Sequence, residues 1–314
     1  MPVVIVWVVV FAASLYILIQ SSDYFTRAAG QIGLAFGLPD FLVGLTIIAI
    51  GTSLPEIVSS LFAVLSGSSQ IVVGNVVGSN VTNVFLVIGV AALIGKKIEI
   101  TYELIHIDLP LLMGSALFLA VTVWDGSFTL FEAILCLAGV VVYMLHAVFT
   151  KEKRSAATRR RLQRKRINWQ TVATLVASAL FIYVGGKYTI DAVIALSEVL
   201  RIGTEVIAAS VIALGTSLPE LAVTIAAARQ GRPEIAVGNV IGSNIFNALA
   251  VMGIPALLGN LVIPNNIITF GIPMMLIASL LFFFMGQDKE ITQWEGWLLI
   301  IFYVFFIGKL FAVV

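Results

Sequence analysis

The chain has 314 residues, of which 60% are hydrophobic and only 11% are charged. Soluble domains carry roughly a quarter charged residues, so this composition excludes an ordinary soluble globular protein. The single cysteine, Cys136, excludes a disulfide framework and a cysteine-based metal cluster. The net charge of +1 conceals a strong segregation, because nine of the 18 lysines and arginines lie between Lys151 and Arg166.

Apolar segments long enough to cross a bilayer follow one another along the whole chain. A spanning helix needs about 20 mostly apolar residues, because it rises about 1.5 Å per residue through about 30 Å of hydrocarbon. Ten spans are expected, at 2–20, 39–65, 70–94, 104–122, 128–149, 169–186, 203–229, 234–258, 267–286 and 294–313. The first segment lacks a basic region before its long apolar run, so we interpret it as an uncleaved span and not as a signal peptide.

The basic run between the fifth and sixth spans sets the expected orientation. Lysine and arginine concentrate in short cytoplasmic loops of membrane proteins, so we expect this run on the cytoplasmic side of the cell membrane and both termini on the extracellular side. The expected organisation is a first five-helix repeat at 1–150, a basic cytoplasmic linker at 151–168, and a second, inverted five-helix repeat at 169–314.

The two halves share a repeated sequence. Residues 51–89 align without a gap with residues 215–253, at a constant offset of 164, and 19 of the 39 positions are identical. The matched blocks are Gly51-Thr52-Ser53-Leu54-Pro55-Glu56 with Gly215-Thr216-Ser217-Leu218-Pro219-Glu220, and Gly74-Asn75 to Gly78-Ser79-Asn80 with Gly238-Asn239 to Gly242-Ser243-Asn244. Because each half has five spans, an odd number, the second half must cross the membrane in the opposite sense. The predicted fold is an all-α polytopic membrane protein of ten helices in two inverted repeats, an architecture typical of secondary transporters.

Glu56 and Glu220 lie within apolar spans, where an ionised carboxylate costs several kcal/mol unless it is paired or bound to a metal ion. The spans offer almost no lysine or arginine at midplane depth to pair with them. The charge must therefore be balanced by a bound cation or removed by a proton, since desolvation disfavours the charged form. We expect cation and proton to compete for this site.

Neutral oxygen ligands accompany each carboxylate. Thr52 and Ser53 share a helix face with Glu56, and their hydroxyls are candidate ligands, as are those of the equivalent Thr216 and Ser217. Pro55 and Pro219 kink their helices and leave the carbonyls of Gly51 and Gly215 without a helical hydrogen bond inside the membrane. The neighbouring carbonyls of Ala49 and Ala213 thereby become candidate ligands too.

The next helix of each half carries a polar stripe at a spacing of four, Asn75, Ser79 and Asn83 in the first and Asn239, Ser243 and Asn247 in the second. The interleaved glycines at G-x-x-x-G spacing permit close helix contact, which explains them equally well as packing residues. Together the motifs offer carboxylate, hydroxyl, amide and backbone oxygens without thiol or imidazole. Such a donor set suits Na⁺ or Ca²⁺ and argues against zinc or copper.

These paired blocks resemble the two α-repeats of the calcium/cation antiporter superfamily, and within it those of the prokaryotic type of sodium/calcium exchanger. The resemblance covers both halves and implies antiport of Na⁺ against Ca²⁺ by alternating access, with three Na⁺ sites and one Ca²⁺ site. It also implies that the ion ligands are Ala49, Thr52, Ser53, Glu56, Ser79, Asn83, Ala213, Thr216, Ser217, Glu220, Ser243 and Asn247. Asn247 occupies a place where potassium-dependent relatives carry aspartate, which makes potassium co-transport less expected.

Other functions use the same residues. A proton/calcium antiporter could neutralise the two glutamates with two protons, and it remains the main alternative. An intramembrane enzyme would need one asymmetric site, and a channel would conduct without a counter-ion. No G-x-x-x-x-G-K-[ST] nucleotide loop occurs, so an ion gradient is the expected energy source. No cofactor, nucleotide, nucleic acid or obligate protein partner is expected, and the partners are the lipid bilayer and the transported Na⁺ and Ca²⁺.

Overall fold

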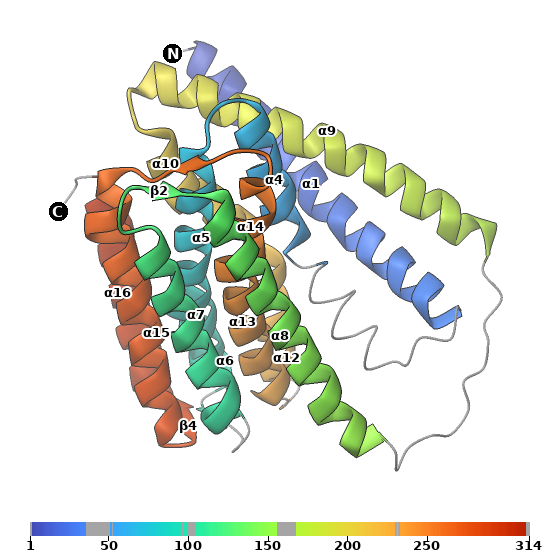
Figure 1. Cartoon of the computed structure of the whole chain (residues 1–314), viewed down its shortest axis with the longest axis vertical. Coiled ribbons are helices and arrows are strands. Elements are labelled where there is room, and N and C mark those ends of the chain that lie inside the picture. The colour runs from blue at the N-terminus through green and yellow to red at the C-terminus, as the bar shows by residue number, and fades with distance from the viewer. Residues whose placement is uncertain are drawn as a thin grey trace.

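The structure is a computed structural model that describes residues 2–35, 51, 53–95, 97–99, 104–155, 168–229, 231 and 233–311. These residues form a bundle of helices with four very short strands (Figure 1). The first half contains α1 (Pro2–Ala35), α4 (Leu54–Leu65), α5 (Gln70–Thr82), η2 (Asn83–Ile88), α6 (Gly89–Gly95), β1 (Lys97–Glu99), η3 (Leu104–Asp108), α7 (Leu109–Thr122), β2 (Ser127–Phe128) and α8 (Leu130–Ser155). The second half contains α9 (Trp169–Leu200), α10 (Thr204–Ile207), η4 (Ala208–Ile212), α11 (Ala213–Thr216), α12 (Leu218–Arg229), α13 (Pro233–Phe246), η5 (Asn247–Val251), α14 (Met252–Ala256), β3 (Leu261–Val262), η6 (Ile267–Gly271), α15 (Ile272–Gln287), β4 (Glu290–Thr292) and α16 (Gln293–Leu310).

Six helical segments of the described chain are long and apolar enough to cross a membrane, and a seventh is counted when the bent pair 204–216 and 218–229 is taken as one span. Three shorter apolar helices, Leu54–Leu65, His106–Thr122 and Leu130–Leu145, coincide with the remaining expected spans. Each expected span thus overlaps a helix of the described chain, but only six of them, or seven with the bent pair, are long and apolar enough to cross a membrane. Residues 39–50 and 52 of the second expected span lie outside the described residues.

Two helices extend well beyond the spans expected at 2–20 and 169–186. α1 continues to Ala35 and α9 continues to Leu200, so their charged halves are helical as well. A charged residue ends an apolar run without ending a helix, and the Asp23–Arg27 pair, 3.7 Å apart with a spacing of four, is compatible with helical geometry. α1 and α9 pack along each other and lie obliquely to the rest of the bundle (Figure 1).

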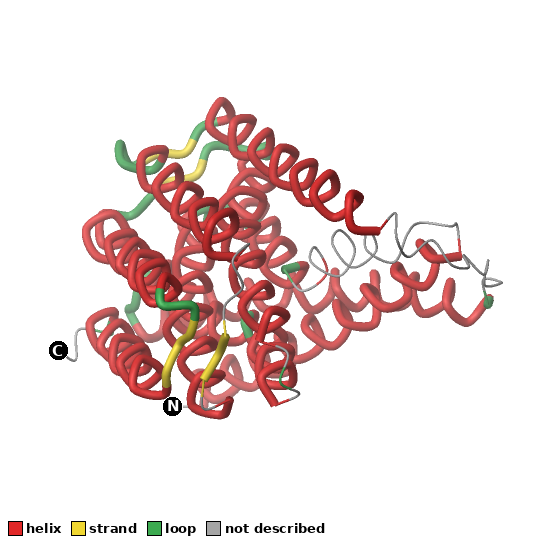
Figure 2. Tube along the Cα trace, turned by 90° about the horizontal axis from the view of Figure 1, so that it is seen from below, coloured by secondary structure: helices red, strands yellow, loops and turns green. Residues whose placement is uncertain are grey.

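The four strands form two small antiparallel sheets, which the sequence did not predict. β1 pairs with β4 through Ile98 and Ile291, and β2 pairs with β3 through Ser127 and Val262. Val262 is residue 98 plus the offset of 164, and Ile291 is residue 127 plus the same offset, so the two sheets have equivalent registers. The sheets lie at opposite ends of the bundle, as β2 and β4 show in Figure 1, and Figure 2 shows both pairs as yellow strands outside the helical core.

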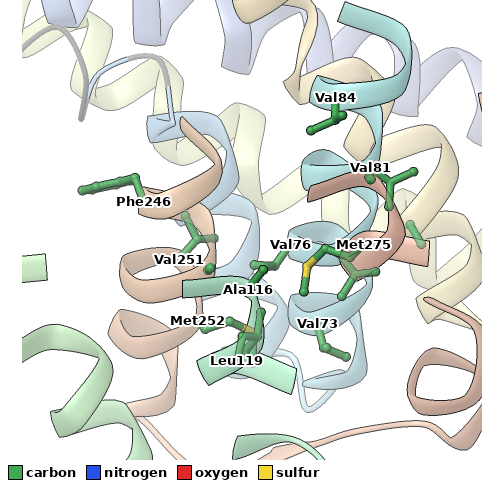
Figure 3. Close-up of a cluster of buried hydrophobic side chains, with 14 of the residues drawn as sticks. Val73, Val76, Val81, Val84, Ala116, Leu119, Phe246, Val251, Met252 and Met275 are labelled. Carbon is green, nitrogen blue, oxygen red and sulfur yellow. The ribbon is translucent and has the colours of Figure 1, made fainter. Parts of the chain in front are cut away.

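The core is built where helices of the two halves meet. Figure 3 shows valines of α5 beside Ala116 and Leu119 of α7 and Met275 of α15. α5 also approaches the second half closely, because a Cβ added at Gly74 or Gly78 would collide with backbone atoms of Glu205 or Ala209. The glycine spacing of this helix therefore serves helix packing, as the packing interpretation of the G-x-x-x-G motif predicted.

The helix that precedes Glu220 is broken at the predicted place. The segments 204–216 and 218–229 meet at an angle of 42°. Ser217, at the break, has φ −81° and ψ 1°, and the equivalent Ser53 before α4 has φ −90° and ψ 9°. A proline follows each serine by two residues, and its missing N–H accounts for the break. The break at Ser217 and the turn at Ser53 are each followed by the helical turn that carries a buried carboxylate.

Candidate ion-binding site

Glu56 and Glu220 sit in the first turns of α4 and α12, shortly after the turn at Ser53 and the helix break at Ser217, respectively. Their side chains are 0% and 1% exposed, respectively. The two carboxylates lie close enough to repel each other electrostatically, and the Thr216 hydroxyl lies near the Glu56 carboxylate. The structure therefore brings the two predicted carboxylates of the two halves into one buried site.

Glu56 is not neutralised by a basic side chain. Among the described residues no lysine or arginine forms an ion pair with it, and neither of its carboxylate oxygens has a hydrogen-bond partner. A salt bridge to a basic residue on another span, the alternative to a role in ion binding, therefore does not explain Glu56 within the described chain. A buried carboxylate left in this way requires a cation or a proton.

The remaining predicted side chains gather on elements that contact the two carboxylate helices. α4 contacts α5, α11 and η5, while α12 contacts α13, α11 and η2. These elements carry the described candidates Ser79, Asn83, Thr216, Ser243 and Asn247, and every one of these side chains is buried. The hydroxyl of Ser243 donates to Glu220 Oε1 at 3.3 Å. Helices from both halves thus enclose a single polar cluster.

Most of these polar atoms are unsatisfied. Buried atoms without a hydrogen-bond partner among the described residues include Ser53 Oγ, both Glu56 oxygens, Ser79 Oγ, Asn83 Oδ1, Ser217 Oγ, and Oδ1 and Nδ2 of Asn247. Buried polar groups in folded proteins are nearly always hydrogen-bonded, so a concentration of exceptions in one place needs a specific explanation. All but one of these atoms are oxygens, which is the donor set of a hard cation.

Asn83 and Asn247 lie at a further irregularity. Each begins a π-helical turn, η2 and η5 respectively, and the two turns occupy equivalent positions of the halves. π-helical turns inside α-helices are frequent at functional sites, because they shift the side chains that follow them. The sequence identified these asparagines from their spacing but did not reveal the irregular turns.

Four backbone and hydroxyl candidates need separate description. Ala49 and Thr52 lie outside the described residues. Ala213 is fully buried, but its carbonyl accepts the Ser217 N–H at 3.1 Å, so the helix break does not leave this oxygen without a partner. The Thr216 hydroxyl donates its proton to the Ile212 carbonyl at 3.1 Å, so the lone pairs of Thr216 Oγ1 point away from that carbonyl.

Two asparagines of the polar stripe that are not among the predicted ligands contact the helices that carry the carboxylates. Asn75 Nδ2 lies 3.5 Å from the Glu56 carbonyl, and the equivalent Asn239 Nδ2 lies 3.3 Å from the Glu220 carbonyl. The same amides also donate to Ser60 Oγ and Thr224 Oγ1, respectively, residues that are themselves 164 positions apart. These asparagines hold the two carboxylate helices against α5 and α13.

Asn80 and Asn244 were not among the predicted site residues. Each donates its side-chain amide to the backbone carbonyl of the other, at 3.3 and 3.1 Å. Asn83 Nδ2 in addition donates to Asn244 Oδ1 at 2.9 Å. Their identity in both repeats was the sequence signal for them, but their reciprocal contact depends on how the halves are packed.

Comparison with known proteins agrees with this arrangement. The family model described as sodium/calcium exchanger protein matches residues 6–149 and 170–311. The sodium/calcium exchanger MaX1 of Methanosarcina acetivorans is 34% identical over 95% of this chain and 97% of its own. The inner membrane protein YrbG of Escherichia coli is 34% identical over 78% of this chain and 77% of its own.

Solved structures resemble the whole chain as well. Structures of the sodium-calcium exchanger NCX_Mj soaked with Na⁺ superpose with a TM-score of 0.68 at 29% identity, over 98% of this chain and 99% of that one. The buried carboxylates, the apolar helices and the matches along both halves lead to one conclusion. This chain is an integral membrane protein that belongs to the sodium/calcium exchanger family of transporters.

Proposed function

We propose that this protein is a secondary active antiporter that exchanges Na⁺ for Ca²⁺ across the membrane by alternating access. The observation that carries the proposal is the cluster of unsatisfied buried oxygens around Glu56 and Glu220. Such oxygens are stabilised when a desolvated cation binds them. The names of MaX1 and NCX_Mj as sodium/calcium exchangers identify which cations to expect.

The chemistry of the donors supports calcium and sodium in particular. Ca²⁺ takes six to eight oxygen ligands in flexible geometry and needs carboxylates to offset its charge. Among the described residues no group of three or more His, Cys, Asp or Glu side chains is placed to hold a metal ion. The proposed site therefore combines two carboxylates with neutral oxygens, which disfavours transition metals.

We assign ligand roles to the full set predicted from sequence. The proposed ligands are Ala49, Thr52, Ser53, Glu56, Ser79 and Asn83, with Ala213, Thr216, Ser217, Glu220, Ser243 and Asn247. Ca²⁺ on the two glutamates gives a neutral site, whereas three Na⁺ leave one net positive charge. Three Na⁺ per Ca²⁺, the number that the family resemblance implies, is the proposed stoichiometry, and by this charge count the exchange is electrogenic.

The proposed architecture is ten spanning helices in two inverted five-helix repeats joined by the linker at 151–168. The equivalent registers of the two sheets support it, because β1 corresponds to β3 and β2 to β4 under the 164-residue offset. Equivalent strands lie at opposite ends of the bundle, as an inversion requires (Figure 1). The two reciprocal amide contacts between Asn80 and Asn244 are equivalent under the same offset.

The proposed orientation in the cell membrane has both termini outside. α1 begins and α16 ends at the end of the bundle where β2 lies, whereas α8 ends, with the basic residues that follow Lys151, at the opposite end (Figure 1). Lys97 of β1 lies in the sheet with β4, which is at the same end as the C-terminus of α8. Lysine and arginine at one end support a cytoplasmic assignment for that end.

The decisive experiment is Ca²⁺ uptake into vesicles that contain the purified protein. Vesicles loaded with Na⁺ and diluted into Na⁺-free medium should accumulate radioactive Ca²⁺, and vesicles carrying Glu56→Gln should not. Uptake that follows an imposed pH gradient but ignores the Na⁺ gradient would replace this proposal with the proton/calcium antiporter. Uptake that needs no counter-ion at all would indicate a channel.

A further inference from the structure

The amide of Asn83 is held in one orientation by a chain of hydrogen bonds that crosses between the two halves. Its Nδ2 donates to Asn244 Oδ1 at 2.9 Å, and Asn244 Nδ2 donates to the carbonyl of Asn80 at 3.1 Å. All three side chains are at most 3% exposed. The chain of bonds runs from a fixed backbone carbonyl to a proposed ion ligand.

Each amide in this chain has only one possible orientation. A backbone carbonyl is an acceptor only, so Asn244 must turn its Nδ2 toward Asn80 and its Oδ1 away from it. That Oδ1 can only accept, so Asn83 must turn its own Nδ2 toward Asn244. The Asn83 Oδ1 is then the one atom of that amide left without a hydrogen-bond partner in the buried cluster.

We propose that Asn244 is a positioning residue that orients the Asn83 amide so that its oxygen, and not its nitrogen, is presented to the cation. This inference rests on the proposed function, since it assigns Asn83 as a cation ligand. A reversed amide would present two N–H donors to a positive ion, which is repulsive. Asn244 itself touches no ion in this role and acts only through Asn83.

The equivalent bond in the other half is not made. Under the offset, Asn247 Nδ2 should donate to Asn80 Oδ1, yet within the described chain both of these atoms are without a hydrogen-bond partner, as is Asn247 Oδ1. Asn80 instead donates its Nδ2 to the Asn244 carbonyl, 3.3 Å away, and to Met275 Sδ, 3.6 Å away. In this conformation Asn244 therefore orients a proposed ligand and Asn80 does not, although the two residues are equivalent in sequence.

This difference supplies a matched control. Asn80→Ala and Asn244→Ala remove the same side chain from the same interface, and each removes one amide bond to the backbone of the partner residue. Only Asn244→Ala also removes the acceptor of Asn83. A purely structural role predicts that the two substitutions have equal effects, whereas a positioning role predicts unequal effects on ion binding.

The test is equilibrium Ca²⁺ binding to the full-length protein in detergent, measured by titration calorimetry. Asn244→Ala should raise the Ca²⁺ dissociation constant about tenfold, the magnitude typical of losing a buried hydrogen bond to an ion ligand. Asn80→Ala should raise it less than about threefold. In an Asn83→Ala background, Asn244→Ala should have no additional effect within about twofold, since it acts through that residue. If Asn244→Ala does not fold, Asn244→Ser applies the same test, because its hydroxyl is too short to replace Oδ1.

The outcomes separate the two proposals. Wild-type protein that binds neither Ca²⁺ nor Na⁺ contradicts the proposed function and this inference with it. Wild-type protein that binds Ca²⁺, but loses affinity equally with Asn80→Ala and Asn244→Ala, contradicts the positioning role alone. Additive effects of Asn83→Ala and Asn244→Ala also overturn it.

Discussion

Replacing Glu56 by glutamine removes one of the two charges available to Ca²⁺ while keeping the side chain's size. The side chain is fully buried, and within the described part of the chain neither carboxylate oxygen has a hydrogen-bond partner, so the substitution breaks no hydrogen bond made by the described residues. The effect on ion binding therefore reports the charge itself. Removing one partner of a buried charge pair costs about 3–5 kcal/mol, which corresponds to a loss of roughly 150- to 4,000-fold in affinity for Ca²⁺.

The substitution should have a second, opposite effect on the ion-free protein. Glu56 and Glu220 repel each other across the site, and both are removed from water. Glu56→Gln relieves that repulsion, so the ion-free variant should be at least as stable as the wild type. Ca²⁺ at 100 times its dissociation constant should stabilise the wild type by about 2.7 kcal/mol, or a rise in Tm of about 5–10 °C, and should leave the variant almost unchanged.

Thermal unfolding in detergent, with and without Ca²⁺, measures both effects on one sample. The matched control is Glu198→Gln, which removes a carboxylate from an exposed position on α9 and should retain the full Ca²⁺-dependent shift. A variant at position 56 that keeps the wild-type shift would refute the assignment of Glu56 as a ligand. A variant that is unstable without ions would refute the argument that its carboxylate is uncompensated.

Three further predictions follow from the site and its packing. First, Na⁺-driven Ca²⁺ accumulation in vesicles clamped at different potentials with K⁺ and valinomycin should vary with voltage, because one net charge is worth about 2.3 kcal/mol per 100 mV; accumulation that ignores the clamp contradicts three Na⁺ per Ca²⁺. Second, Asn247→Asp adds a third carboxylate to the buried cluster and should strengthen cation binding and introduce a response to K⁺, so binding isotherms for Na⁺ and K⁺ that match the wild type contradict it. Third, Gly78→Ala should destabilise the protein by about 1–3 kcal/mol, because the added methyl group collides with the Ala209 backbone. The control Gly114→Ala, at an exposed helical position, should be neutral or stabilising. Equal Tm values for the two variants would show that α5 is not closely packed at Gly78.

The sequence by itself determined the class of protein and the chemistry of its site. Long apolar segments predict spanning helices because the bilayer offers no partner for backbone groups, and this rule depends on composition alone. The 164-residue repeat pairs ten of the twelve proposed ligands, all of them polar, and a duplicated polar residue in an apolar helix is seldom accidental. Pro219 predicted the 42° break before Glu220 for a local reason, the absence of its N–H.

Only the tertiary structure decided which groups meet. The pairing of β1 with β4 and of β2 with β3 joins segments too short and too distant in sequence for any local pattern to reveal. α1 and α9 pack along each other, and this contact joins segments too distant in sequence for a local pattern to reveal. The hydrogen bond from Asn83 to Asn244 but not from Asn247 to Asn80 distinguishes residues that the repeat makes equivalent. Sequence symmetry cannot predict such a difference, because it arises from how the two halves pack in one conformation.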